Sequence, residues 1–142
     1  MKHTDLMLND LVMYQGKILR VGCISDYDIK IDLFEDGEDT PYAEIWQEEL
    51  DEVKPIPLTA EILDENGFRL IGTVWHYRGY TYDVCVEFTD KIAVRIYNEL
   101  KPKDEKGRQD MVSYNRDWAQ PFYVHELQHA LRLCGIDKEI VL

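Results

Sequence analysis

The residues best suited to chemistry lie near the C-terminus, where His125, Glu126 and His129 form the pattern H-E-x-x-H. On a helix, the two histidines of this pattern lie one turn apart and can bind zinc, while the glutamate acts as a general base. The pattern is typical of zinc-dependent hydrolases. It raises the hypothesis of metal-assisted hydrolysis, with His125 and His129 as ligands.

A catalytic zinc ion needs a third protein ligand and an open position for water. The extended pattern that supplies this ligand fails here, because Arg132 stands at its glycine position and Gly135 at its third histidine. After His129 the carboxylates are Asp137 and Glu139, and neither has a second helix from which to reach back. We interpret the match as accidental and keep the zinc hydrolase as the alternative hypothesis.

One helix must position these residues, and the stretch from Tyr123 to Gly135 predicts it. At about 100° per residue, the apolar residues of this stretch fall on one broad arc. Pro121 before it suits a first turn, and Gly135 suits a left-handed C-cap. The polar side chains are predicted on the opposite side, solvated or in a second layer: His125, Gln128, His129 and Arg132.

The stretch YVHELQHALRLCGI, together with the segments KPIPLT and ENGF, resembles a family of small proteins from Bacteroides-type bacteria and their phages or other mobile elements. The resemblance is loose over the N-terminal segment and closer from Pro55 to Leu142. Family members often carry glutamine at the position of Glu126 and asparagine at that of His129. The resemblance therefore implies that neither the base nor the second ligand is required, and it implies a fold without an activity.

The net charge of −12 is concentrated in one segment. Between Asp26 and Glu52 the chain holds twelve acidic residues and one basic residue, Lys30, while the other charges nearly cancel. Such a surface repels nucleic-acid phosphates and anionic membranes, and it favours a basic protein partner. A solvated face that aids solubility is the alternative. The candidate contacts lie at a predicted hairpin tip: Glu35, Asp36, Glu38 and Asp39.

The cysteines and the hydropathy indicate a cytoplasmic protein. Cys23, Cys85 and Cys134 are odd in number and widely spaced, as expected of small core residues in a reducing compartment. The first residues, MKHTDLMLNDLV, lack the apolar run of a secretory signal. No stretch approaches the roughly eighteen apolar residues of a membrane span. We expect neither membrane contact nor a cofactor, with zinc as the alternative.

Residues 1–54 predict a small lobe of short strands joined by tight turns. The segments LVMY and KILRVGCI flank Gln15 and Gly16, which suit a two-residue hairpin turn. This organisation is similar to that of small SH3-like β-barrels, although fold alone does not give function. The acidic balance argues against an RNA-binding version. Pro55 and Pro57 favour extended backbone, and we place the lobe boundary there.

Residues 55–142 predict an α+β lobe. Thr59 suits the cap of a helix over Ala60–Asn66, and residues 69–97 alternate as a three-stranded meander. A long polar loop over 100–117 and the C-terminal helix follow, and the tail after Gly135 could add an edge strand. The fold class is therefore α+β, with an SH3-like lobe followed by a meander packed against two helices. Basic residues of the loop could meet the acidic segment of a second copy, which would favour a homo-oligomer.

Aromatic residues gather in the C-terminal lobe, and Trp75, Tyr77 and Tyr80 are candidates for a binding rim. Core packing is the alternative for most of them. His76 is expected to make one hydrogen bond rather than to bind metal. Taken together, the sequence predicts a non-enzymatic interaction protein of a phage or mobile element, with a protein partner that is basic in charge.

Overall fold

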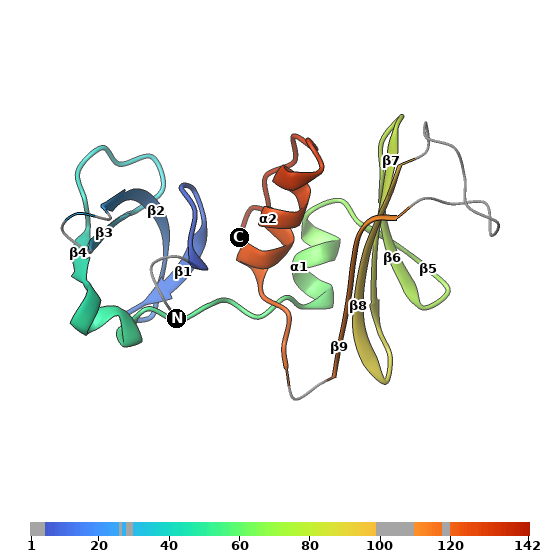
Figure 1. Cartoon of the computed structure of the whole chain (residues 1–142), viewed down its shortest axis with the longest axis horizontal. Helices are drawn as coiled ribbons and strands as arrows, with labels where there is room; N and C mark the ends of the chain where they lie inside the picture. The colour runs from blue at the N-terminus through green and yellow to red at the C-terminus, as the bar shows by residue number, and fades with distance from the viewer. Residues whose placement is uncertain (1–4, 26, 28–29, 99–109, 118–119) are drawn as a thin grey trace. The chain divides into compact units, whose positions relative to one another are not determined.

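The computed structural model describes residues 5–25, 27, 30–98, 110–117 and 120–142 (Figure 1). The chain divides into two compact units, which we describe separately. The first unit comprises Met1–Ile56 and Tyr123–His129, and the second comprises Pro57–Phe122 and Ala130–Leu142. The helix α2 (Val124–Leu133) thus contributes its first half to the first unit, whereas the sequence placed the whole helix in a lobe of residues 55–142.

The first unit contains a four-stranded antiparallel sheet whose strands are neighbours in chain order. Gln15 and Gly16 join the first two strands with φ values of 49° and 76°. Positive φ at both positions is what a tight two-residue turn between antiparallel strands requires, and the predicted hairpin is confirmed. The strands are β1 (Leu11–Tyr14), β2 (Lys17–Ser25), β3 (Lys30–Phe34) and β4 (Ala43–Trp46).

One face of this sheet forms the apolar core of the first unit, since alternate residues of each strand point inward. The buried core residues are Leu6, Val12, Leu19, Val21, Ile31, Leu33, Ile45, Leu50 and Val53. After β4 the chain forms a 3-10 helix, η2 (Gln47–Glu52), and Lys54 then pairs with Met13 of β1 in an isolated bridge. The described residues form no closed barrel, so the SH3-like barrel stays a prediction.

The second unit contains a five-stranded antiparallel sheet, also in chain order. The prediction of a three-stranded meander is therefore wrong in its count. Residues 69–78 form a hairpin rather than one strand, and the end of the predicted polar loop forms a strand of its own. The strands are β5 (Arg69–Ile71), β6 (Val74–Arg78), β7 (Tyr82–Phe88), β8 (Lys91–Asn98) and β9 (Asp110–Asp117).

The strand β9 forms because its alternate residues match those of β8. Val112 lies opposite Ile96, and Tyr114 lies opposite Val94. Tyr114 also packs on Phe122, with ring centroids 5.4 Å apart. The polar residues between these positions concealed the alternation. The rest of the predicted loop falls outside the described residues, including the basic residues Lys101, Lys103, Lys106 and Arg108.

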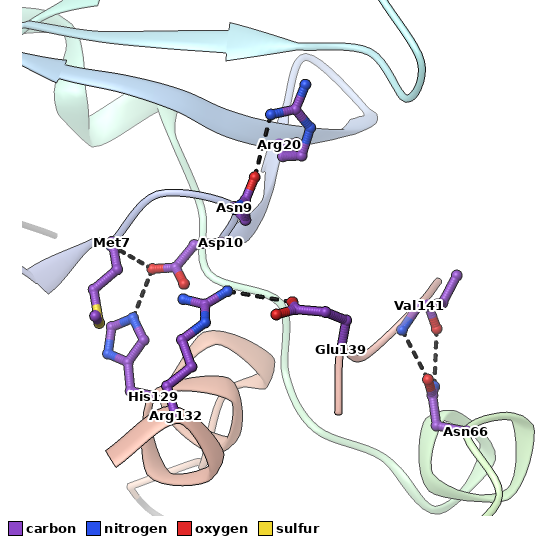
Figure 2. Close-up of polar contacts among 9 residues, drawn as sticks. All are labelled: Met7, Asn9, Asp10, Arg20, Asn66, His129, Arg132, Glu139 and Val141. Atoms are coloured by element: carbon purple, nitrogen blue, oxygen red, sulfur yellow. Dashed lines mark hydrogen bonds and ion pairs between the residues drawn. The ribbon is translucent and has the colours of Figure 1, made fainter. Parts of the chain in front are cut away.

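The helix α1 (Ala60–Glu65) begins at Thr59, whose Oγ1 accepts the backbone N–H of Ile62 at 3.3 Å, as predicted. It ends at Asn66, whose buried amide binds both backbone groups of Val141 at 2.7 and 2.8 Å (Figure 2). The C-terminal tail is therefore held by this side chain and does not form the predicted edge strand. Gly135, with φ of 70°, ends α2 as predicted.

In the second unit, a residue that follows α1 and a residue that follows α2 both pack on the same side chain of the sheet. Phe68, after α1, packs on Tyr77 of β6 with ring centroids 5.3 Å apart. Lys138, after α2, lies over the same ring at 5.2 Å. With two antiparallel sheets and two α-helices in its described part, the chain is an α+β protein. None of the described helices combines the length and apolar character that crossing a bilayer requires.

Candidate functional site

The H-E-x-x-H residues lie in the first two turns of α2. The backbone N–H of Val124 donates to the carbonyl of Ile56 at 2.8 Å, which fixes the start of this helix in the first unit. Glu126 accepts the backbone N–H of Tyr123 at 3.3 Å. A carboxylate at this position satisfies a donor that a helix N-terminus leaves open, and it complements the helix dipole. Glu126 therefore has a structural role that needs no catalysis.

His129 contacts a carboxylate that the sequence-based search did not consider. Its Nε2 lies 2.7 Å from Oδ2 of Asp10, and the same oxygen accepts the backbone N–H of Met7 at 2.7 Å (Figure 2). Asp10 is fully buried. A buried carboxylate is costly unless hydrogen bonds replace its water, and His129 supplies one of them. Asp10 lies 119 positions before His129, so the residues near the motif carry no sign of this contact.

His125 is buried, with 6% of its surface exposed, and its ring stacks on that of Tyr123 with centroids 5.9 Å apart. Its Nδ1 has no hydrogen-bond partner among the described residues. Burial lowers the pKa of His125 below its usual value, and the charges of Asp10 and Glu126 oppose that shift without cancelling it. The imidazole is therefore neutral at pH 7.

The polar side of α2 was predicted to be solvated or in a second layer, and two of its residues are not solvated. His125 and Gln128 are both buried. The burial of His125 has its cause within the first unit. There the segment around Asp10 contacts His129 and covers this side of the helix. Helical periodicity separates polar from apolar positions, but it does not reveal whether a distant segment covers the polar ones.

The three motif residues line a cavity of about 610 Å³ in the first unit, together with Asp5, Met7, Pro55 and Tyr123. Nε2 of His129 faces Asp10, and in the described chain no group of three ligand atoms within 4.8 Å of one another includes either imidazole of the motif. The cavity offers a ligand a neutral imidazole and carboxylates.

Comparisons with family models, curated proteins and solved structures find no match to this chain. The function therefore has to be inferred from the chemistry of its own residues. Two further groups of residues bear on it. One is the acidic segment that the sequence singled out, and the other is a cluster in the second unit that the sequence-based prediction missed.

The acidic hairpin tip lies between β3 and β4, and three of its four candidate residues are exposed. Asp36, Glu38 and Asp39 have exposed side chains. Glu35 is partly buried, and its carboxylate pairs with the ammonium of Lys17 from β2. Since Lys17 precedes the acidic segment, this pair could not be predicted from the charge pattern of that segment. The tip therefore presents three carboxylates to a partner rather than four.

The single base of the acidic segment is neutralised by its own neighbours. Nζ of Lys30 lies 3.7 Å from Asp32 and 3.6 Å from Glu44, and it lies over the ring of Trp46 at 5.7 Å. Trp46 itself is 41% exposed. We call the exposed carboxylates of this segment the acidic surface: Asp36, Glu38, Asp39, Glu44, Glu48, Glu49, Asp51 and Glu52.

The three aromatic candidates do not form one exposed rim. Trp75 and Tyr77 are partly buried in β6, and the ring of Tyr77 stacks on Tyr82 with centroids 6.3 Å apart. Tyr80 is fully exposed in the turn between β6 and β7. Trp75 and Tyr77 therefore contribute to packing on one face of the sheet, and Tyr80 is the candidate whose ring is available to a partner.

The opposite face of this sheet brings together His76, Asp83 and Cys85. Nδ1 of His76 lies 3.1 Å from Oδ1 of Asp83 and 3.4 Å from Sγ of Cys85. His76 was expected to make a single hydrogen bond, and the convergence of three groups was missed. The sequence indicated only that Asp83 and Cys85, two positions apart in a strand, lie on the same face. The register that places His76 opposite Cys85 is not visible in the sequence.

Proposed function

We propose that the first unit is a protein-interaction module that binds a basic partner through the acidic surface. The observation that carries this proposal is the pairing of Lys30 with Asp32 and Glu44. Because the one base of the segment is already neutralised, most carboxylates of the acidic surface meet no cation from their own segment. The field of these charges extends into solvent and attracts Lys and Arg side chains.

Trp46 supplies an apolar contact within the acidic surface. Trp46 is 41% exposed, and in the chain it stands between Glu44 of β4 and the acidic residues of η2. Protein interfaces are enriched in aromatic anchors, while surrounding charges steer the partner and set its orientation. A partner with basic residues around an apolar side chain would satisfy both features. The same charges oppose nucleic acid and anionic membranes as partners.

Several finer hypotheses accompany this function. An SH3-like organisation of the first unit is supported by the bridge between Met13 and Lys54, which returns the chain to β1 after η2. The cytoplasm as the place of action is supported by three free cysteines. A phage or mobile-element context rests on the resemblance of the segments KPIPLT, ENGF and YVHELQHALRLCG. The last hypothesis is self-association, in which basic residues of the loop over 100–117 contact the acidic segment of a second copy.

Binding of a labelled lysine-rich peptide tests the function directly. We expect the full chain to bind this peptide, and to bind an uncharged peptide of equal length at least about tenfold more weakly, which corresponds to about 1.4 kcal/mol. Because exposed charges are screened by salt, affinity falls as ionic strength rises from about 0.01 to 1 M. Equal binding of both peptides at low salt would refute the proposal.

The alternative function is a zinc-dependent hydrolase that uses His125, Glu126 and His129. The observation that favours it is the cavity that all three residues line. Stoichiometric zinc in the purified protein, lost in the His129→Ala variant, would support this alternative. A zinc content that is unchanged in this variant would exclude the hydrolase, since two imidazoles of the motif are needed as ligands.

A further inference from the structure

The face of the second unit's sheet opposite Trp75 and Tyr77 carries three potential metal ligands on two neighbouring strands. Asp83 and Cys85 lie two positions apart on β7 and point to the same face. His76 of β6 is paired with Cys85 in the sheet register, so its ring approaches both side chains. Their ligand atoms all lie within 4.8 Å of one another. Paired strands therefore hold the three groups on a rigid support.

We propose that His76, Asp83 and Cys85 form a binding site for a divalent transition metal of the zinc type. The site lies in the second unit, and it is independent of the acidic surface and of the histidines on α2. Nδ1 of His76, Oδ1 of Asp83 and Sγ of Cys85 are the ligand atoms. A fourth ligand is water or a small exogenous molecule.

The distances between these atoms match those around a metal ion. Ligands bound at about 2.0–2.3 Å to a tetrahedral zinc ion lie about 3.3–3.6 Å from each other. In the structure, Nδ1 of His76 lies 3.4 Å from Sγ of Cys85, and 3.1 and 3.3 Å from the two oxygens of Asp83. The three groups therefore need only small movements to coordinate an ion placed between them.

The charges and ligand types select the class of metal. Asp83 and a Cys85 thiolate together carry two negative charges, which balance a divalent cation. Magnesium and calcium prefer oxygen ligands only, whereas zinc accepts nitrogen, oxygen and sulfur. Coordination requires the thiolate, so metal binding displaces the proton of Cys85.

Arg78 acts as a positioning residue for the carboxylate. Its Nε donates to Oδ2 of Asp83 at 3.4 Å, while Oδ1 is the oxygen nearest to His76. Asp83 is almost completely buried, with 1% of its side chain exposed. An outer hydrogen bond of this kind orients a ligand and tunes its affinity for the metal. One carboxylate oxygen is thereby held by the guanidinium and the other is directed toward the imidazole.

Two cavities adjoin the cluster through His76. His76 lines a cavity of about 220 Å³ together with Cys85, Glu87, Arg95 and Tyr97. It also lines a second cavity, of about 430 Å³, that includes Arg69 and Arg78. Three protein ligands beside an open space are typical of zinc sites that keep a position for water or substrate. The arginines at both cavities favour an anionic fourth ligand.

Cobalt(II) is the probe that tests this site, because a thiolate ligand gives it a characteristic charge-transfer absorption. We expect the full-length protein to bind one cobalt ion with this absorption, and zinc to displace it. Cys85→Ser removes the absorption. Loss of an outer-shell partner already costs about 10–100-fold in metal affinity, so Cys85→Ser and His76→Gln should each weaken binding at least about 100-fold.

Two controls separate a specific site from general thiol binding. Cys23→Ser removes an exposed cysteine of the first unit and should leave cobalt affinity unchanged within about twofold. If Cys85→Ser does not fold, alkylation of the unmodified protein serves instead, since cobalt should protect Cys85 and leave Cys23 reactive. The proposal is overturned if no thiolate absorption develops, if it survives Cys85→Ser, or if Cys85 stays unprotected.

Discussion

Nε2 of His129 lies 2.7 Å from the buried carboxylate of Asp10, and this hydrogen bond connects α2 to the segment before β1 within the first unit (Figure 2). It gives the second histidine of the H-E-x-x-H pattern a structural role. Glu126 has another, as acceptor for the backbone N–H of Tyr123, directly before the helix. Two residues of the motif thus make hydrogen bonds within the first unit.

The Asp10 contact predicts a stability cost for His129→Ala. Removing the donor leaves a buried carboxylate with fewer hydrogen bonds, and we expect the free energy of unfolding to fall by about 1–3 kcal/mol. His129→Gln keeps an N–H donor of similar reach and should lose less than half as much. Urea denaturation of the three proteins measures the difference. Equal losses in both variants would show that the hydrogen bond is not what His129 contributes.

The capping role of Glu126 predicts a stability loss for Glu126→Ala and almost none for Glu126→Gln. Glu126→Ala removes the acceptor at the N-terminus of α2 and should cost about 0.5–1 kcal/mol in unfolding free energy. Glu126→Gln retains a side-chain oxygen and should be nearly neutral, since glutamine also serves at this capping position. Thermal unfolding of both variants provides the measurement. A glutamine variant as unstable as the alanine variant would contradict the capping role.

His125 predicts a loss of stability in acid. Burial lowers its pKa in the folded state, so the unfolded chain takes up this proton first as the pH falls. The stability that neutral His125 contributes is fully present above the unfolded pKa of about 6.5. Below this pH it declines toward the folded pKa by at most about 1.4 kcal/mol per pH unit.

The His125→Phe variant isolates this contribution, because phenylalanine retains an aromatic ring beside Tyr123 but does not titrate. We expect the stability difference between the variant and the unmodified protein to shift in favour of the variant below about pH 6.5. Denaturation in urea from pH 8 down to pH 5 measures it. A difference that is independent of pH would mean that the burial of His125 does not affect its protonation.

Local signals in the sequence predicted the local elements well. Gln15 and Gly16 specified a hairpin, Thr59 a helix start and Gly135 a helix end, because each acts through residues within a few positions. The α+β class followed from the same signals. The strand β9 was missed because its alternation is weak on its own and becomes stable only when paired with β8.

Contacts between distant residues explain what could not be predicted in the candidate sites. The pairing of His129 with Asp10 depends on a contact across 119 positions. The cluster of His76 with Cys85 depends on a strand register, and a shift of one residue would turn these side chains to opposite faces. The acidic surface was easier to predict than these contacts, because its exposed carboxylates lie close together in the chain.

The most direct test of the central claim compares two variants of equal net charge in peptide binding. One neutralises the hairpin tip, with Asp36→Asn, Glu38→Gln and Asp39→Asn, and the other neutralises exposed residues of the second unit, with Asp64→Asn, Glu65→Gln and Asp137→Asn. Exposed ion pairs contribute about 0.2–1 kcal/mol each, so the tip variant should bind the lysine-rich peptide about tenfold more weakly. The second variant should bind it as the unmodified protein does. Equal weakening by both variants would show that net charge alone attracts the peptide, and it would contradict a binding site on the acidic surface.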